Sequence, residues 1–155
     1  DLPGRWMTGT QNHEGIMGAM AAVDYLASLM PNVVNRRKAL CQSMAAIEAY
    51  ENELMGHLLE ALYTLPGYTF FGITDSGRLA ERVPTLSFTH TRLRPQELAQ
   101  RLDEAGIFAW HGNYYAQPVT EALGLEPEGA VRIGLLHYNT LEEVDRLVAA
   151  LRHLS

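Results

Sequence analysis

Apolar residues recur at helical spacing over several stretches of the chain. The longest stretch runs from about Val33 or Arg36 to Tyr63, and small residues dominate an earlier one from Asn12 to Met30. Helices are also predicted from Pro95 to about Ala105 and after Thr140, where Thr140 and Glu143 form a capping-box pattern. A short helix is expected over 118–123.

Four shorter apolar runs lie between these helices and end at glycine, proline or polar clusters. They predict strands at 68–73, 83–90, 107–110 and 131–136. After the first helix, the order is helix, two strands, helix, two strands, helix. This order predicts an α/β (α+β) fold with a small, mostly antiparallel sheet covered by helices on one face.

Composition narrows the function classes. The 155 residues are 47% hydrophobic and 19% charged, which is ordinary for a globular domain. A net charge of −6 argues against nucleic acid or an anionic membrane as a partner. Cys41 is the single cysteine, so no disulfide within the chain is expected, and the cytoplasm is the default location. The first residues lack a signal-peptide pattern, and the chain does not begin with an initiator methionine, so we expect a fragment of a longer protein.

The stretch from Gly106 to Thr140 holds the densest candidate chemistry. His111, Asn113, Tyr114 and Tyr115 follow one predicted strand, and Arg132 lies inside the next. Strand alternation places Arg132 on the face opposite its apolar neighbours. It is either an exposed strand arginine or a bidentate clamp for a carboxylate.

Gly9 and Thr10, just before the first helix, form a second candidate. Free N–H groups and a hydroxyl at a helix N-terminus suit an anion such as phosphate. The same residues are also common where a helix is simply capped. No phosphate loop, GxSxG or CxxC motif is present, and the six histidines lack the spacing of a zinc site.

Three segments in register resemble one enzyme family. Residues 5–12 (RWMTGTQN) are similar to its R-F-E-x-G-T-P-N pattern, and residues 106–118 to its G-I-A-V-R-x-G-x-x-C-A-Q-P pattern. Residues 131–140 (VRIGLLHYNT) are similar to its x-R-x-S-x-x-x-Y-N-T pattern. The chain thus resembles the C-terminal part of a fold-type I, pyridoxal-phosphate-dependent enzyme of the class V aminotransferase group. The likeness is to its cysteine desulfurase and selenocysteine lyase branch.

The resemblance implies a role for each matched residue. Gly9 and Thr10 would contact the cofactor phosphate in the partner subunit of a homodimer, and Arg132 would hold the carboxylate of an amino-acid substrate. Asn139 and Thr140 would close a turn and cap the last helix. Residues 1–31 would be the phosphate loop and connecting helix of a large domain whose remainder is missing, and residues 32–155 the C-terminal small domain.

Departures from the family pattern concern the reaction. Tyr115 stands where desulfurases carry their cysteine, and Trp110 replaces an arginine. A phenol cannot accept sulfur as a persulfide, so we expect Tyr115 to act as a hydrogen-bond donor or proton relay. His111 and Asn113 would line the substrate side. The reaction stays open between desulfurase, lyase and transaminase.

The cofactor's Schiff-base lysine has no match in this chain. Lys38 is the only lysine, and it lies at a predicted helix start. We therefore expect the chain alone to be inactive, as one part of a larger pyridoxal-phosphate enzyme. The alternative is a stand-alone, non-enzymatic α/β module for ligand binding or assembly.

Overall fold

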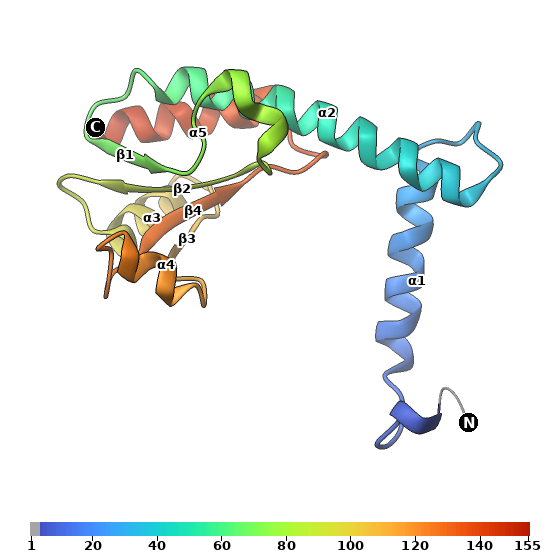
Figure 1. Cartoon of the computed structure of the whole chain (residues 1–155). Coiled ribbons are helices and arrows are strands. Elements are labelled where there is room, and N and C mark those ends of the chain that lie inside the picture. The colour runs from blue at the N-terminus through green and yellow to red at the C-terminus, as the bar shows by residue number, and fades with distance from the viewer. Residues whose placement is uncertain (1–3) are drawn as a thin grey trace. The chain divides into compact units, whose positions relative to one another are not determined.

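The computed structural model describes residues 4–155 (Figure 1). The chain divides into two compact units, residues 1–48 and 49–155, and the boundary lies within the helix α2. The sequence-based boundary at 31/32 rests on family resemblance instead, and it stays a prediction. Each unit is described by itself below.

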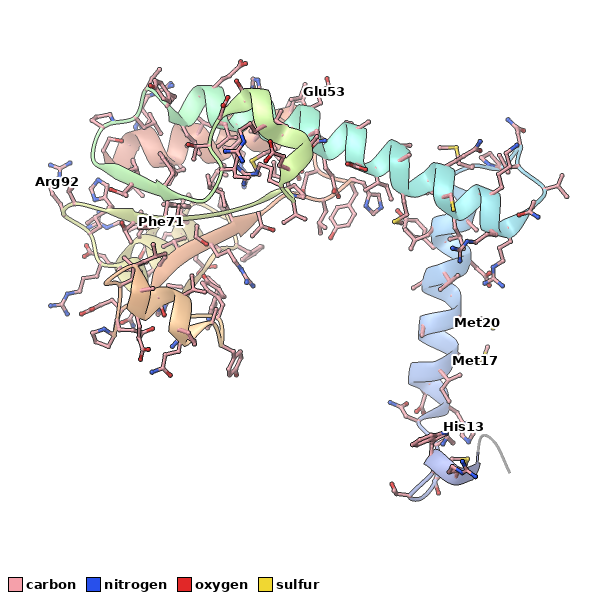
Figure 2. The ribbon with its side chains drawn as sticks, in the orientation of Figure 1. His13, Met17, Met20, Glu53, Phe71 and Arg92 are labelled. Atoms are coloured by element: carbon pink, nitrogen blue, oxygen red, sulfur yellow. The ribbon has the colours of Figure 1, made fainter. Side chains whose placement is uncertain are left out.

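The first unit contains a short 3₁₀ helix, η1 (Gly4–Trp6), the helix α1 (His13–Ser28) and the start of α2 (Arg36–Leu62). The Asn12 side chain caps α1 by accepting a hydrogen bond from the Gly15 N–H at 2.8 Å. An ion pair of 2.6 Å joins Arg36 to Asp24. No residue of α1 is buried within the described part of the chain. Figure 2 shows two of its exposed apolar side chains, Met17 and Met20, projecting from the helix.

The second unit holds the rest of α2 and all the strands. In order, it adds β1 (Tyr68–Phe71), η2 (Ser76–Glu81), β2 (Thr85–His90), α3 (Pro95–Glu104), β3 (Trp110–Gly112), α4 (Gln117–Ala122), β4 (Ala130–Gly134) and α5 (Leu141–Leu154). The four strands pair in the order β1-β2-β4-β3, and every neighbouring pair is antiparallel. This confirms the predicted small antiparallel sheet.

One face of the sheet carries the core. The register pairs Phe70 with Phe88, Phe88 with Val131, and Leu86 with Ile133, so these side chains share a face. Buried residues of α2, α3 and α5 complete the same cluster: Leu54, Leu58, Leu62, Leu98, Leu102, Val144, Leu147 and Leu151. The three helices therefore cover one face, as predicted, and the other face of the sheet is left for the site.

Two segments differ from their predictions. The expected strand at 107–110 begins three residues later, because Ile107 still donates a backbone hydrogen bond to the Leu102 carbonyl at the end of α3. No helix was predicted between the strands at 68–73 and 83–90, but η2 forms there, and the Asp75 side chain caps it by accepting from the Gly77 N–H at 2.8 Å.

Candidate functional site

Arg132 lies on the uncovered face of the sheet. It sits near the middle of β4, between the buried residues Val131 and Ile133, and its own side chain is exposed. The register pairs it with Ser87 of β2 on one side and Trp110 of β3 on the other. The predicted alternation is confirmed, and the register places Trp110 directly across from Arg132.

An aromatic ring covers the Arg132 guanidinium. The Cζ atom lies over the Tyr114 ring, 4.0 Å from its centroid, in a cation–π contact. No hydrogen bond or ion pair involves the Arg132 side chain among residues 4–155. An open groove surrounds the pair, lined also by Thr85, Phe108, Trp110 and Gly134. The N–H donors of the guanidinium are therefore unoccupied within the described chain.

The loop after β3 holds Tyr114 in place. Tyr114 and Tyr115 both have left-handed backbones, with φ of 56° and 59°, a conformation that costs non-glycine residues free energy. The Tyr114 hydroxyl donates a hydrogen bond to the Trp110 carbonyl. Burial raises the pKa of the Tyr114 phenol, while the backbone of Arg132 and, to a smaller extent, its charge act to lower that pKa. The phenol therefore stays protonated at neutral pH, as a donor.

Asn113 and Tyr115 shape the tip of this loop. The Asn113 side-chain oxygen accepts the Tyr115 N–H at 3.2 Å, and its backbone carbonyl accepts the Ala116 N–H at 2.8 Å. The Tyr115 side chain is fully exposed. The predicted site residue Asn113 thus supports the turn that presents Tyr115 to solvent.

His111 lies on the other face of the sheet. Its register partner is Val131, whereas Trp110 pairs with Arg132. Its surroundings are a hollow lined by α3 residues, among them Gln96, Gln100 and Asp103. The cation–π contact therefore brings Tyr114 to Arg132, and the register places Trp110 across from it, although the Trp110 ring stacks on that of His111, with 5.8 Å between the centroids. Side-chain alternation would have predicted Trp110 on the same face as Arg132 if β3 had been predicted to begin at Trp110. No sequence pattern indicates the fold-back of Tyr114.

Gly9 and Thr10 belong to the first unit. They lie in an exposed bend before α1, and Asn12 rather than either of them provides the helix cap. No hydrogen-bond partner occupies the Gly9 or Thr10 amide within residues 4–155. Two amides and a hydroxyl are the donor set that a phosphate group requires.

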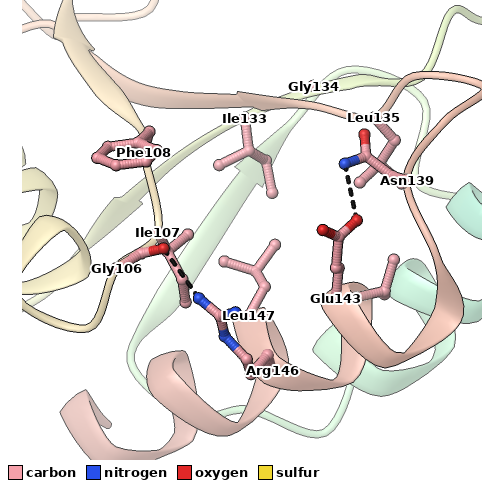
Figure 3. A pocket seen from close by; sticks show the side chains of 11 residues that line it. Gly106, Ile107, Phe108, Ile133, Gly134, Leu135, Asn139, Glu143, Arg146 and Leu147 are labelled. Atoms are coloured by element: carbon pink, nitrogen blue, oxygen red, sulfur yellow. Dashed lines mark hydrogen bonds between the residues drawn. The ribbon is translucent and has the colours of Figure 1, made fainter.

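A second hollow lies between α5 and the chain segments that lead into β3 and out of β4 (Figure 3). Its polar groups bond to one another. Arg146 donates to the Gly106 carbonyl at 2.9 Å, and the Asn139 amide donates to the Glu143 carboxylate at 3.0 Å. Asn139 also accepts the Leu136 N–H, and Thr140 and Glu143 form the capping box of α5. The predicted structural roles of Asn139 and Thr140 are confirmed.

Further features of the described residues concern metal ligands, membrane-spanning helices and the lysine. No group of three or more potential metal ligands lies together in residues 4–155. No helix there is long and apolar enough to cross a membrane. The lone lysine, Lys38, is exposed near the start of α2, in the first unit. The candidate residues are thus Gly9 and Thr10 in the first unit and, in the second unit, Arg132 with the Tyr114 ring against its guanidinium.

Comparisons with known proteins give a consistent picture. The family model described as aminotransferase class-V matches residues 1–147. An uncharacterized protein of Mycobacterium tuberculosis (strain CDC 1551 / Oshkosh) is 33% identical over 98% of this chain and 37% of its own length. A cysteine desulfurase of Synechococcus elongatus is 32% identical over 98% of this chain and 21% of its own length.

A solved structure shares the fold. The apo structure of cysteine desulfurase from Thermococcus onnurineus NA1 superposes with a TM-score of 0.78 and 28% sequence identity. The match covers 98% of this chain and 33% of that one. The chain therefore spans well under half the length of the proteins to which it is similar.

Proposed function

Since this chain belongs to the class V aminotransferase family, we propose that it forms the C-terminal part of a pyridoxal-phosphate-dependent enzyme that acts on an amino acid. Enzymes of this family depend on that cofactor, and the cysteine desulfurases similar to this chain are at least two and a half times its length. The single observation that carries the proposal is Arg132, a cation on an uncovered sheet face with no acid partner in the described chain.

Arg132 would bind the carboxylate of the amino acid. A guanidinium presents a planar fork of N–H donors that matches a carboxylate in bidentate fashion. Because its neighbour on one face is an aromatic ring rather than an acid, its donors and charge are available to the ligand. The open groove beside it would admit the substrate from that face.

The donors at Gly9 and Thr10 fit the cofactor's phosphate group. Their two amides and the Thr10 hydroxyl would hold it in a neighbouring subunit, as in the family pattern. When bound, the cofactor supplies an electron sink that stabilises negative charge at the substrate's α-carbon. The lysine that anchors it would come from outside this chain, since Lys38 lies exposed on α2.

Tyr115 bears on the type of reaction. It occupies the cysteine position of the desulfurase pattern, and its exposed phenol offers a hydrogen-bond donor but no thiol. Cys41 lies in the other compact unit, on α2. We therefore propose lyase or transaminase chemistry ahead of sulfur transfer to a cysteine of this chain, with Tyr115 donating to the substrate or relaying a proton.

The proposed partners are the remainder of the enzyme and a second copy of it. The helix α1 supports this, because it is apolar around most of its surface and has no buried residue in the described chain. A helix of this kind is typical of a protein interior or an interface. A homodimer would also bring the Gly9 and Thr10 segment of one subunit to the site of the other.

The test measures binding of L-alanine and L-alaninamide to the whole, cofactor-loaded protein. The wild type should prefer L-alanine, because the amide lacks the carboxylate. Arg132→Ala should weaken L-alanine binding by about 100-fold, the loss expected for a charge-assisted pair of hydrogen bonds, and should abolish the preference. Arg152→Ala, at an exposed arginine of α5, serves as the matched control.

Unchanged L-alanine affinity in Arg132→Ala would overturn the carboxylate assignment. The stand-alone module makes a different prediction, namely that the 155-residue chain without its remainder binds L-alanine with undiminished affinity.

A further inference from the structure

The Arg132 guanidinium needs something to hold it. An exposed arginine side chain samples many rotamers, and fixing it on a ligand costs side-chain entropy. A nearby carboxylate can fix such a fork, but that partner also neutralises the charge and occupies the donors. No acidic side chain pairs with Arg132 in the described part of the chain.

The Tyr114 ring is the group in position to do this. It lies under the guanidinium, with 4.0 Å between Cζ and the ring centroid. A ring covers only the face of the cation and leaves the N–H edge uncovered. The guanidinium is thereby oriented without losing charge or donors to an acid.

The ring itself is fixed from the other side. The Tyr114 hydroxyl donates to the carbonyl of Trp110, the residue that pairs with Arg132 across β3 and β4. The left-handed backbone at Tyr114 and Tyr115 folds the loop back over this strand pair. Such a conformation persists where its surroundings over-determine it, and the hydroxyl bond and the cation contact are those surroundings.

We propose that Tyr114 is a positioning residue, which orients the Arg132 guanidinium for a substrate carboxylate through its ring and is itself anchored through its hydroxyl. This inference rests on the proposed function of Arg132 and adds a residue that the sequence pattern left without a role. Tyr114 acts through Arg132 and makes no contact with the substrate in this scheme.

The experiment is a double-mutant cycle on the whole, cofactor-loaded protein, with L-alanine as the probe. Tyr114→Leu removes the ring and should weaken binding about 3- to 10-fold, the range of a partly desolvated cation–π contact. Tyr114→Phe keeps the ring and loses only the anchor, so it should recover at least half of that loss on a logarithmic scale. In the Arg132→Ala background, Tyr114→Leu should have no further effect, because the group it orients is gone.

A second readout needs no substrate. In NMR spectra of protein labelled at arginine, the Arg132 side-chain signals should shift in Tyr114→Leu, since the ring current is lost, and should stay near their wild-type positions in Tyr114→Phe. The control is Tyr63→Leu, at an exposed tyrosine beyond the end of α2, which should move neither the Arg132 signals nor the affinity.

The outcomes separate this inference from the proposed function. If Arg132→Ala weakens L-alanine binding but Tyr114→Leu does not, or if the two effects add fully, Tyr114 has no positioning role. Unshifted Arg132 signals in Tyr114→Leu would overturn it as well. If the wild type does not bind L-alanine or Arg132→Ala binds it normally, the proposed function fails first.

Discussion

At the residue scale, two glycines allow the loop that carries Tyr114 to form. Gly112 ends β3 with φ of 123°, and Gly129 lies just before β4 with φ of 69°. A Cβ atom built on Gly129 would overlap the backbone of Gly112. The backbone at Gly129 therefore lies so close to that of Gly112 that position 129 has no room for a Cβ atom.

Gly129→Ala should strongly destabilise the protein, because it adds both a backbone clash and a left-handed alanine. We expect a loss of about 3 kcal/mol or more. Gly124→Ala is the matched control, since Gly124 has nearly the same φ, 68°, and open space around it. That variant should lose only about 1–2 kcal/mol. Thermal unfolding of both variants measures the difference, and equal shifts in Tm would contradict the close approach.

At the element scale, His90 organises the connection from β2 to α3. Its Nδ1 accepts the backbone N–H groups of Arg92 at 3.2 Å and Leu93 at 3.1 Å, which requires that nitrogen to be unprotonated. Burial lowers the His90 pKa, and the Arg92 charge lowers it further. The neutral imidazole is therefore part of the folded turn.

Acid should weaken this connection. Above the ordinary histidine pKa of about 6.5, His90 is neutral whether the chain is folded or unfolded, and its contribution to stability is intact. As the pH falls, the unfolded chain binds the proton first, so stability decreases until the pH passes below the lowered pKa of the folded state.

His90→Asn should flatten this dependence, because an asparagine oxygen accepts the N–H two residues ahead without titrating. Tm measured from about pH 7 to about pH 5 should fall less in His90→Asn than in wild type. The control His153→Asn, at an exposed histidine of α5, should leave the wild-type slope unchanged. A slope in His90→Asn as steep as that of the wild type would refute the assignment.

At the scale of the whole molecule, the helix α1 is the surface that we propose meets a partner. Its apolar residues Ile16, Met17, Met20 and Val23 are all exposed in the described chain, and Figure 2 labels Met17 and Met20 among them. Contiguous exposure of this kind is uncommon in a monomer and is typical of an interaction surface.

The double variant Met17→Lys, Met20→Lys should disrupt the proposed dimer or its packing on the rest of the enzyme, because burying two lysines without partners costs several kcal/mol. Light scattering coupled to size-exclusion chromatography would measure the loss of dimer, and thermal unfolding the loss of stability. Tyr63→Lys, at an exposed position outside α1, should change neither. If the double variant kept the wild-type mass and Tm, the face of α1 that carries Met17 and Met20 would not be an interface.

Much of the fold was predictable because its signals are local. The helical spacing of α2 and α5, the capping pair Thr140 and Glu143, and the alternation around Arg132 each involve residues close in sequence. Local propensity and periodicity encode such features directly. The family resemblance likewise depends on short segments, and it identified the family that the comparisons show.

The site was predictable only in part, because its geometry depends on pairing between distant segments. The sequence alone determined that Arg132 faces away from the apolar side of its strand. The tertiary structure decided which neighbours it has: the register of β3 against β4 brings in Trp110 and turns His111 away. A left-handed backbone, invisible to any hydrophobic pattern, then folds Tyr114 under the guanidinium. Periodicity specifies the face on which a side chain lies, whereas register and backbone dihedrals decide what it touches.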